Sequence, residues 1–114
     1  MKSYLIGIDI GTSGTKTAIF DNDGNLISEA YEESKLYYPE AGAVEQDCDE
    51  IFYSATNTIK ECIEKSQLNP SMIEGIAIDG QMAGICGIDK DWNPVTPYDS
   101  WLDTRCSPYI NLLK

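Results

Sequence analysis

Two apolar runs joined by a short glycine-containing turn limit the fold more than any other feature of the sequence. Residues 5–10 and 15–20 are rich in isoleucine and other residues that favour strands. Because so few residues separate the runs, we expect them to pair as an antiparallel β-hairpin, with the run from Leu5 to Ile10 largely buried. Gly11 and Gly14 let the backbone of the turn bend and approach a ligand closely.

The residues in and beside this turn predict phosphate binding. Asp9 is the one charge inside the first run, and a buried carboxylate is costly unless it is paired, hydrogen-bonded or near a cation. Backbone N–H groups, hydroxyls and a cation suit a polyphosphate, and a carboxylate suits its Mg²⁺. The hydroxyls and the cation come from Thr12, Ser13, Thr15 and Lys16. The alternative is an ordinary hairpin with a polar turn and no ligand.

Two familiar phosphate-binding loops do not fit this stretch. The P-loop has four residues between its glycines and opens a helix, whereas two residues separate Gly11 from Gly14 and a strand is expected next. The dinucleotide-binding fingerprint also opens a helix. A strand–turn–strand hairpin with an aspartate at its entry instead resembles the first phosphate motif of the actin-like ATPase superfamily, which includes sugar kinases, actin and Hsp70-type chaperones.

Charge and cysteine content narrow the classes of function. The formal net charge of −11 makes nucleic acid and anionic membrane surfaces unfavourable partners. No histidine is present and no two cysteines form a Cys-x-x-Cys pair, so we expect no zinc site. Asp9 interrupts the first apolar run too early for a signal sequence or a membrane helix, and we therefore expect a cytoplasmic protein with reduced thiols.

The first 80 residues predict the order β-β-β-α-β. A third strand over 26–33 extends the hairpin into an antiparallel meander. Asp47 and Glu50 form a capping-box pattern at the start of a helix that runs to about Ser66. A strand over 72–79 follows, and a strand–helix–strand order implies parallel pairing. The buried face of the helix is predicted to contain Ile51, Phe52, Ala55, Ile59, Cys62 and Ile63.

The remaining residues predict loops, one short strand and a final helix. The strand is expected over 85–88, before a turn. The helix is expected to begin with Ser107 as its N-cap and Pro108 in its first turn.

A second group of polar residues lies where strands are expected to end. These residues are Asp79, Gln81, Asp103 and Arg105, and Met82 and Trp101 are their apolar neighbours in sequence. Sugars bind to such mixtures, because fixed donors and acceptors hold hydroxyls while an aromatic ring covers the apolar side of the sugar. In the structural alternative, Arg105 pairs with Asp103 or Asp99 and Trp101 fills the core.

Four motifs together resemble the start of the FGGY family of carbohydrate kinases, and within it xylulokinases. They are Gly-Ile-Asp-Ile-Gly-Thr-Ser-Gly-Thr-Lys (7–16), Glu-Gln-Asp (45–47), Gly-Gln-Met-x-Gly (80–84) and Trp-x-Asp-x-Arg (101–105). The resemblance implies a ribonuclease H-like (actin-like ATPase) α/β fold with a mixed sheet, ATP and Mg²⁺ as cofactors, a sugar substrate, and allows a homodimer. It places Asp9 at the Mg²⁺. It lines the phosphates with Gly11, Thr12, Ser13, Gly14, Thr15 and Lys16, and the sugar with Gln81, Met82, Trp101, Asp103 and Arg105.

At a few positions this sequence differs from the usual family pattern, and these differences bear on which sugar is bound. Ala83 stands where xylulokinases usually carry histidine, and Val44 replaces the aromatic residue that often begins the Glu-Gln-Asp motif. Glycerol kinases show an Arg-Glu pair near residues 82–83, which is absent here and disfavours glycerol. The expected substrate is therefore xylulose or a related ketose or polyol.

The resemblance also implies that residues 1–114 are the N-terminal part of a longer kinase. The catalytic aspartate and the adenine-binding second domain are expected beyond Lys114, so no catalytic residue is assigned within this chain and the chain alone should be inactive. Two alternatives stay open: an actin-like nucleotide-binding or regulatory module without sugar transfer, and a small interaction domain with no ligand.

Overall fold

The computed structural model describes residues 2–114, which form two compact units. The first unit comprises residues 2–34 and 49–81, and we call it the sheet unit. The second comprises residues 35–48 and 82–114, and we call it the loop unit. The two units are described separately below.

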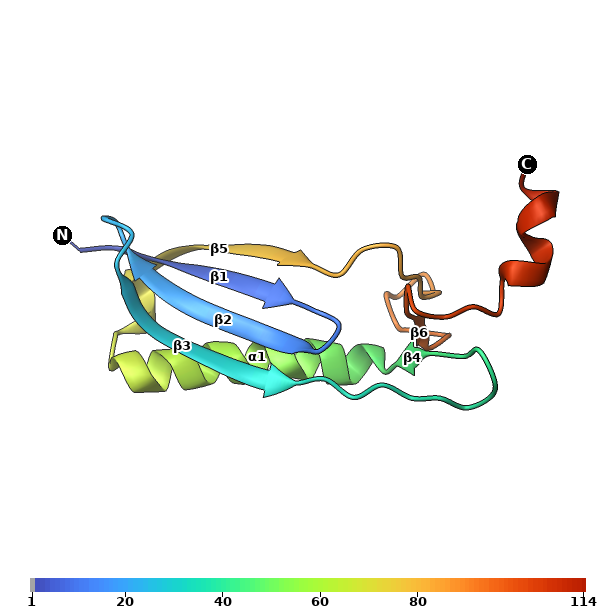
Figure 1. The fold of residues 1–114 in the computed structure, drawn as a ribbon. Helices are drawn as coiled ribbons and strands as arrows, with labels where there is room; N and C mark the ends of the chain where they lie inside the picture. The colour runs from blue at the N-terminus through green and yellow to red at the C-terminus, as the bar shows by residue number, and fades with distance from the viewer. Residues whose placement is uncertain (1) are drawn as a thin grey trace. The chain divides into compact units, whose positions relative to one another are not determined.

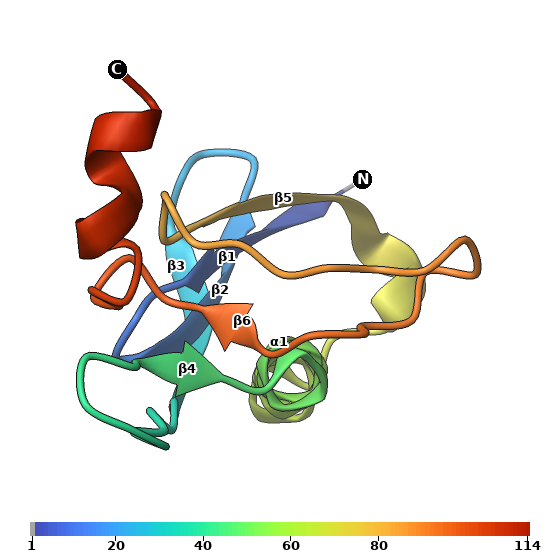
Figure 2. The same cartoon turned by 90° about the vertical axis from the view of Figure 1, so that its right-hand side faces the viewer.

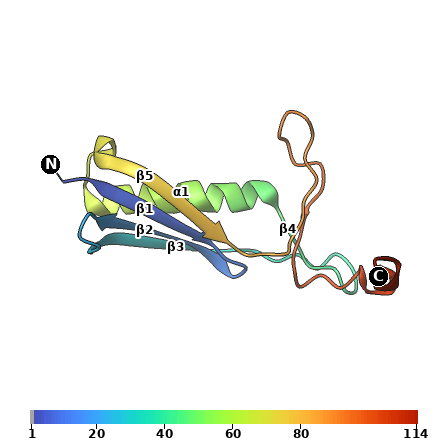
Figure 3. The ribbon, with the colours of Figure 1, turned by 90° about the horizontal axis from the view of Figure 1, so that it is seen from above.

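A mixed four-stranded sheet forms the frame of the sheet unit. Its strands are β1 (Tyr4–Ile10), β2 (Gly14–Asp21), β3 (Leu26–Glu33) and β5 (Ile73–Gly80), in the order β3-β2-β1-β5 (Figures 1 and 3). The first three strands pair antiparallel, whereas β5 runs parallel to β1. The predicted hairpin, meander and parallel pairing are all confirmed.

Helix α1 (Cys48–Ser66) covers one face of this sheet, and a short 3₁₀ helix (Pro70–Met72) leads from it into β5 (Figure 1). The helix begins directly after Asp47 and ends at Ser66, as the sequence predicts. The buried apolar core between sheet and helix consists of Tyr4, Ile6, Ile8, Ile19, Ala30 and Cys62. No helix in the described part of the chain is long and apolar enough to cross a membrane.

Hydroxyl groups, and not only apolar side chains, join α1 to β2. Thr15 Oγ1 lies 2.8 Å from Ser54 Oγ, and Thr17 Oγ1 lies 2.7 Å from Thr58 Oγ1, all in buried positions. The prediction of the buried helix face is wrong at Phe52, whose exposed fraction is 62%. Residues 54, 58 and 62 are four positions apart and therefore form one stripe on the helix, and their partners on β2 make this stripe the buried one.

The opposite face of the sheet is not covered within the sheet unit. Side chains alternate along β1, so Leu5 and Asp9 point away from α1, and both are exposed. The expectation that Leu5 and Asp9 are buried is therefore wrong, because one helix covers only one face. On the other face, Ile76 and Ile78 of the edge strand β5 are also exposed, although their register partners Ile6 and Ile8 are buried.

The loop unit has little regular structure. Strands β4 (Glu45–Gln46) and β6 (Tyr98–Asp99) pair antiparallel, and a 3₁₀ helix spans Ser107–Leu112 (Figure 2). The predicted strand over 85–88 is wrong, since only isolated bridges occur there, between Ile85 and Asp99 and between Ile88 and Pro94. The cap of the final helix is Cys106 and not Ser107, and it makes no side-chain capping bond.

Replacing Ile19 tests the core of the sheet unit. Ile19 is completely buried between the sheet and α1, so Ile19→Ala should lower the free energy of unfolding by about 2–5 kcal/mol, measured by urea denaturation. Ile76→Ala is the matched control, because its side chain is 55% exposed and little packing is lost. Equal losses from the two variants would contradict the assigned core.

Candidate functional site

The turn after β1 is closed by its own backbone and tied to the end of β5. Gly11 N donates to Gly14 O at 2.9 Å, and Gln81 N donates to Ile10 O at 2.9 Å. Thr12 Oγ1 donates to Gln81 Oε1 at 3.0 Å. The structure therefore brings together the first and third sequence motifs through Thr12 and Gln81.

Two glycines permit this close approach. A Cβ atom at Gly80 would lie 2.8 Å from the carbonyl oxygen of Ile10, and one at Gly11 would lie 3.1 Å from the carbonyl oxygen of Gly14. Both obstacles are backbone atoms, which cannot move aside as a flexible side chain can. A side chain at Gly80 would therefore push the end of β5 away from the end of β1, and one at Gly11 would distort the turn itself.

The hydroxyls and the cation assigned to the phosphates have different environments. The Thr15 side chain is fully buried and its hydroxyl faces Ser54 of α1, so only its backbone belongs to the turn. Ser13 is exposed, and its carbonyl oxygen accepts a hydrogen bond of 3.0 Å from Tyr31 Oη. Lys16 forms an exposed ion pair with Glu29 (Nζ–Oε2, 3.2 Å), so its charge is partly offset before any anion arrives.

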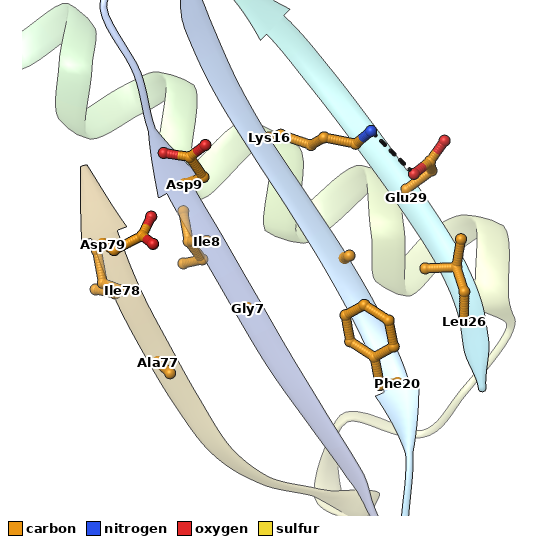
Figure 4. Close-up of a pocket in the computed structure, with 11 residues that line it drawn as sticks. Gly7, Ile8, Asp9, Lys16, Phe20, Leu26, Glu29, Ala77, Ile78 and Asp79 are labelled. Carbon is orange, nitrogen blue, oxygen red and sulfur yellow. Dashed lines mark ion pairs between the residues drawn. The ribbon is translucent and has the colours of Figure 1, made fainter. Parts of the chain in front are cut away.

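Two carboxylates lie side by side at the ends of the parallel strands. Asp9 of β1 and Asp79 of β5 are partners in the parallel register, and their side chains point toward each other (Figure 4). Desolvation by the neighbouring strands, followed by the charge of Asp79 and its hydrogen bonding, raises the pKa of Asp9 above its ordinary value. Both residues line an open hollow on the uncovered face of the sheet.

Small and charged residues share this hollow. The small residues Gly7, Ala18 and Ala77 are among its lining residues. Phe20 and Leu26 lie on β2 and β3, away from the two aspartates (Figure 4). The charged lining residues are Asp9, Asp79, Lys16 and Glu29. Three carboxylates face one ammonium group, so the hollow has an excess of negative charge that a cation would relieve.

The donors fit Mg²⁺ bound together with a nucleotide. Among residues 2–114 no three His, Cys, Asp or Glu side chains form a group that could hold a metal ion without further ligands. Mg²⁺ does not require such a group, because it is usually held by one or two carboxylates together with waters and substrate phosphates. The carboxylate oxygens of Asp9, which lie beside the turn, could serve as such ligands.

The sequence groups Asp79 with the polar residues expected near the sugar and gives it no contact with Asp9. The structure shows that they are neighbours. The signal was present as the similar segments Ile8-Asp9 and Ile78-Asp79, each near a glycine at the end of an apolar strand. Parallel pairing brings the ends of two such strands to the same edge of the sheet.

In the loop unit, Arg105 is surrounded by four carboxylates. Its Nη2 lies 2.7 Å from Glu45, 3.1 Å from Asp99 and 2.8 Å from Asp103, and its Nη1 lies 3.2 Å from Glu40. These contacts raise the pKa of Arg105 above its ordinary value, with Asp103 contributing most. The pairing of Arg105 with Asp103 and Asp99, which is the structural alternative to a sugar contact, is therefore present.

Asp103 connects this ion-pair cluster to the backbone. Its carboxylate accepts hydrogen bonds from Val44 N and Arg105 N, each at 2.9 Å, and from Arg105 Nε. The Arg105 side chain and these N–H groups lower the pKa of Asp103 well below its ordinary value. Glu45 and Asp99 face each other directly across β4 and β6, a repulsive arrangement that Arg105 relieves.

The exposed members of the predicted sugar group are Met82 and Trp101. Their exposed fractions are 83% and 54%. Ala83, between them in sequence, has a positive φ of 63°, a conformation that a residue other than glycine rarely adopts. Of the five residues predicted to line the sugar, Gln81 belongs to the sheet unit. The other four, Met82, Trp101, Asp103 and Arg105, belong to the loop unit.

Comparisons with known proteins agree on one family. Residues 4–114 match the N-terminal domain of the FGGY family of carbohydrate kinases. The chain is 36% identical over 107 residues to a xylulose kinase of Staphylococcus epidermidis and 44% identical over 114 residues to a glycerol kinase of Leptospira biflexa. These alignments cover 94% and 99% of the chain, but only 22% and 23% of the two relatives.

A solved structure supports the same conclusion. A crystal structure of a xyloylose kinase from Brucella ovis matches with a TM-score of 0.91 and 29% identity, covering 96% of this chain and 23% of that one. The ribonuclease H-like, actin-like ATPase fold expected from the sequence is thereby confirmed. The chain spans less than a quarter of the length of these relatives.

Acid should weaken the loop unit through Asp103. Because the folded-state pKa is lowered, this carboxylate stabilises the fold above its ordinary pKa of about 3.9, and the contribution is lost as pH falls through the lower, folded value. Asp103→Asn should therefore reduce stability at neutral pH and flatten its decline between about pH 5 and pH 2.

Tryptophan fluorescence measures this change selectively, since Trp92 and Trp101 both lie in the loop unit. Asp91→Asn, at an exposed position of the same unit, serves as the control and should keep the wild-type pH dependence. An unchanged acid transition in Asp103→Asn would contradict the role of the cluster.

Proposed function

Because the chain belongs to the FGGY family of carbohydrate kinases, we propose that the whole protein transfers a phosphoryl group from ATP to a sugar or polyol hydroxyl. This chain supplies the phosphate loop and part of the sugar site. The substrate is xylulose or a related ketose or polyol. The absence of an Arg-Glu pair at residues 82–83 argues against glycerol, even though several of the matching relatives, including the one that is 44% identical, are glycerol kinases.

The observation that carries the proposal is the turn between β1 and β2. It is short, closed by the Gly11–Gly14 hydrogen bond, and has Asp9 at its entry. Phosphoryl transfer depends mainly on positioning and on neutralising the charge of the phosphates. In this proposal the backbone of residues 11–15 and the side chains of Thr12, Ser13 and Lys16 bind and orient the phosphates.

The metal contributes charge neutralisation when it is bound. Asp9 would hold Mg²⁺, directly or through water, and Mg²⁺ would offset the phosphate charge. Lys16 remains within the same hollow and adds the only ammonium group among its lining residues. Its ion pair with Glu29 is exposed and therefore weak, so Lys16 can turn toward an anion at little cost.

The residues proposed for the sugar site have two roles: some contact the sugar, and others also hold the surrounding backbone in place. Trp101 and Met82 offer exposed apolar surface for the carbon skeleton of a sugar. Gln81 offers an amide that can exchange hydrogen bonds with hydroxyls. Asp103 and Arg105 border the sugar in this proposal, while their mutual hydrogen bonds keep the segment from 101 to 105 in one conformation.

No general base for the sugar hydroxyl is assigned within residues 1–114. Following the family resemblance, the catalytic aspartate and the adenine-binding part belong to sequence beyond Lys114. Residues 1–114 alone should then bind ligands weakly and transfer no phosphate. The four cysteines are free thiols, which supports the further proposal of a cytoplasmic location.

A second candidate function is nucleotide binding without sugar transfer. It is favoured by one observation: the charged groups of Asp103 and Arg105 are already engaged with each other and with neighbouring carboxylates. If these bonds are purely structural, the loop unit contains fewer groups to hold a sugar.

Replacing Trp101 separates the two functions. In the whole protein, Trp101→Ala should raise the KM for the sugar by about two- to tenfold, because an aromatic contact worth roughly 0.5–1.5 kcal/mol is lost, while the Kd for ATP stays unchanged. Steady-state kinetics on a panel of ketoses and polyols, with nucleotide binding by calorimetry, measure both. Trp92→Ala, at an exposed tryptophan of the same unit, is the matched control.

Failure of the wild-type protein to phosphorylate any sugar, with nucleotide binding retained, would favour the second function. Equal effects of the two tryptophan variants would argue against a sugar contact at Trp101.

A further inference from the structure

We propose that Asp79 binds, together with Asp9, the Mg²⁺ that accompanies the nucleotide. This inference rests on the proposed function, since the nucleotide phosphates complete the ligand set. It adds a second carboxylate, from a different strand, to a metal position that the family resemblance assigns through Asp9 alone. The donor would come from the edge strand β5.

The sheet places the two carboxylates together. β1 and β5 run parallel, and the register pairs Ile8 with Ile78, Asp9 with Asp79 and Ile10 with Gly80. Side chains at paired positions of neighbouring strands lie on the same face, about 5 Å apart. Figure 4 shows both carboxylate groups on the uncovered face, directed toward one another. One ion can therefore bind both without movement of the backbone.

The local charge favours a cation between them. Lys16, the one basic residue among those that line the hollow, is paired with Glu29 at 3.2 Å. Lys16 faces Asp9 across β1 and β2, but it is shared with Glu29, so one ammonium group stands against three carboxylates and the negative charge of the two aspartates is only partly offset. Mg²⁺ commonly takes one or two carboxylates, and completes its octahedron with phosphate oxygens and water. A pair of aspartates beside a phosphate loop agrees with that preference.

The position of Asp79 is fixed by its neighbours. Gly80 contacts the backbone of Ile10 so closely that no Cβ would fit, and the next residue donates its N–H to Ile10 O at 2.9 Å. The end of β5 is thus attached to the end of β1 immediately before the phosphate turn. A ligand held on a rigid strand end loses little conformational freedom when it binds a metal.

The test measures metal binding directly. Mn²⁺ substitutes for Mg²⁺ and its free concentration can be followed by electron paramagnetic resonance, with the full-length protein and saturating ADP. Asp79→Asn should weaken Mn²⁺ binding about tenfold or more, because one anionic ligand becomes neutral. Glu74→Gln makes the same charge change near the opposite end of the same strand, at an exposed position, and it should leave Mn²⁺ binding unchanged.

Two outcomes would overturn the proposal. If Asp79→Asn leaves Mn²⁺ affinity unchanged or increases it, Asp79 is only a repulsive neighbour of Asp9. If Glu74→Gln weakens binding as much as Asp79→Asn does, the effect is one of overall charge. Asp79→Ser, checked by circular dichroism, provides a second neutral variant should the asparagine disturb the fold.

The metal measurement and the proposed function can fail separately. Mn²⁺ binding that depends on Asp79, in a protein that phosphorylates no sugar, would retain this inference and reject the sugar kinase function. Sugar phosphorylation by a protein whose Mn²⁺ binding does not depend on Asp79 would retain the sugar kinase function and reject this inference.

Discussion

The in-register parallel pairing of β1 with β5 is the constraint on which the candidate phosphate site depends. It brings the ends of two strands that are about 70 residues apart in sequence to one edge of the sheet. Asp9, Asp79 and the turn between β1 and β2 meet there, and the hydrogen bonds that Gln81 makes with Ile10 and Thr12 fix their spacing. A shift of one residue in this register would direct one of the two aspartates to the face covered by α1.

The loop unit is held together mainly by ion pairs, in contrast to the strand pairing and apolar core of the sheet unit. It has only two short strands, so apolar packing contributes less, and one arginine surrounded by carboxylates holds the chain together. The net charge of −11 makes such a group valuable, since Arg105 offsets repulsion between Glu45 and Asp99 across β4 and β6. The cluster also holds the backbone on either side of Trp101, the exposed aromatic residue proposed to contact the sugar.

The sequence predicted the elements that local chemistry determines. The hairpin follows from its glycines, and the start of α1 from Asp47 and Glu50. The sequence did not predict which side chains are buried, because that depends on partners far away in the chain. Ser54 and Thr58 are buried by their bonds to β2, while Phe52 stays exposed. The proximity of Asp79 to Asp9 was not predicted for the same reason, since strand register sets that neighbour.

Amide hydrogen exchange in the turn after β1 tests the central claim most directly. On addition of saturating ADP and Mg²⁺ to the full-length protein, the N–H groups of residues 12–14 should exchange more slowly, because phosphate oxygens accept their hydrogen bonds. The turn over residues 21–25, at the far end of β2, should be unaffected. Unchanged exchange at residues 12–14, with calorimetry showing the nucleotide bound, would contradict the assignment of this turn as the phosphate loop.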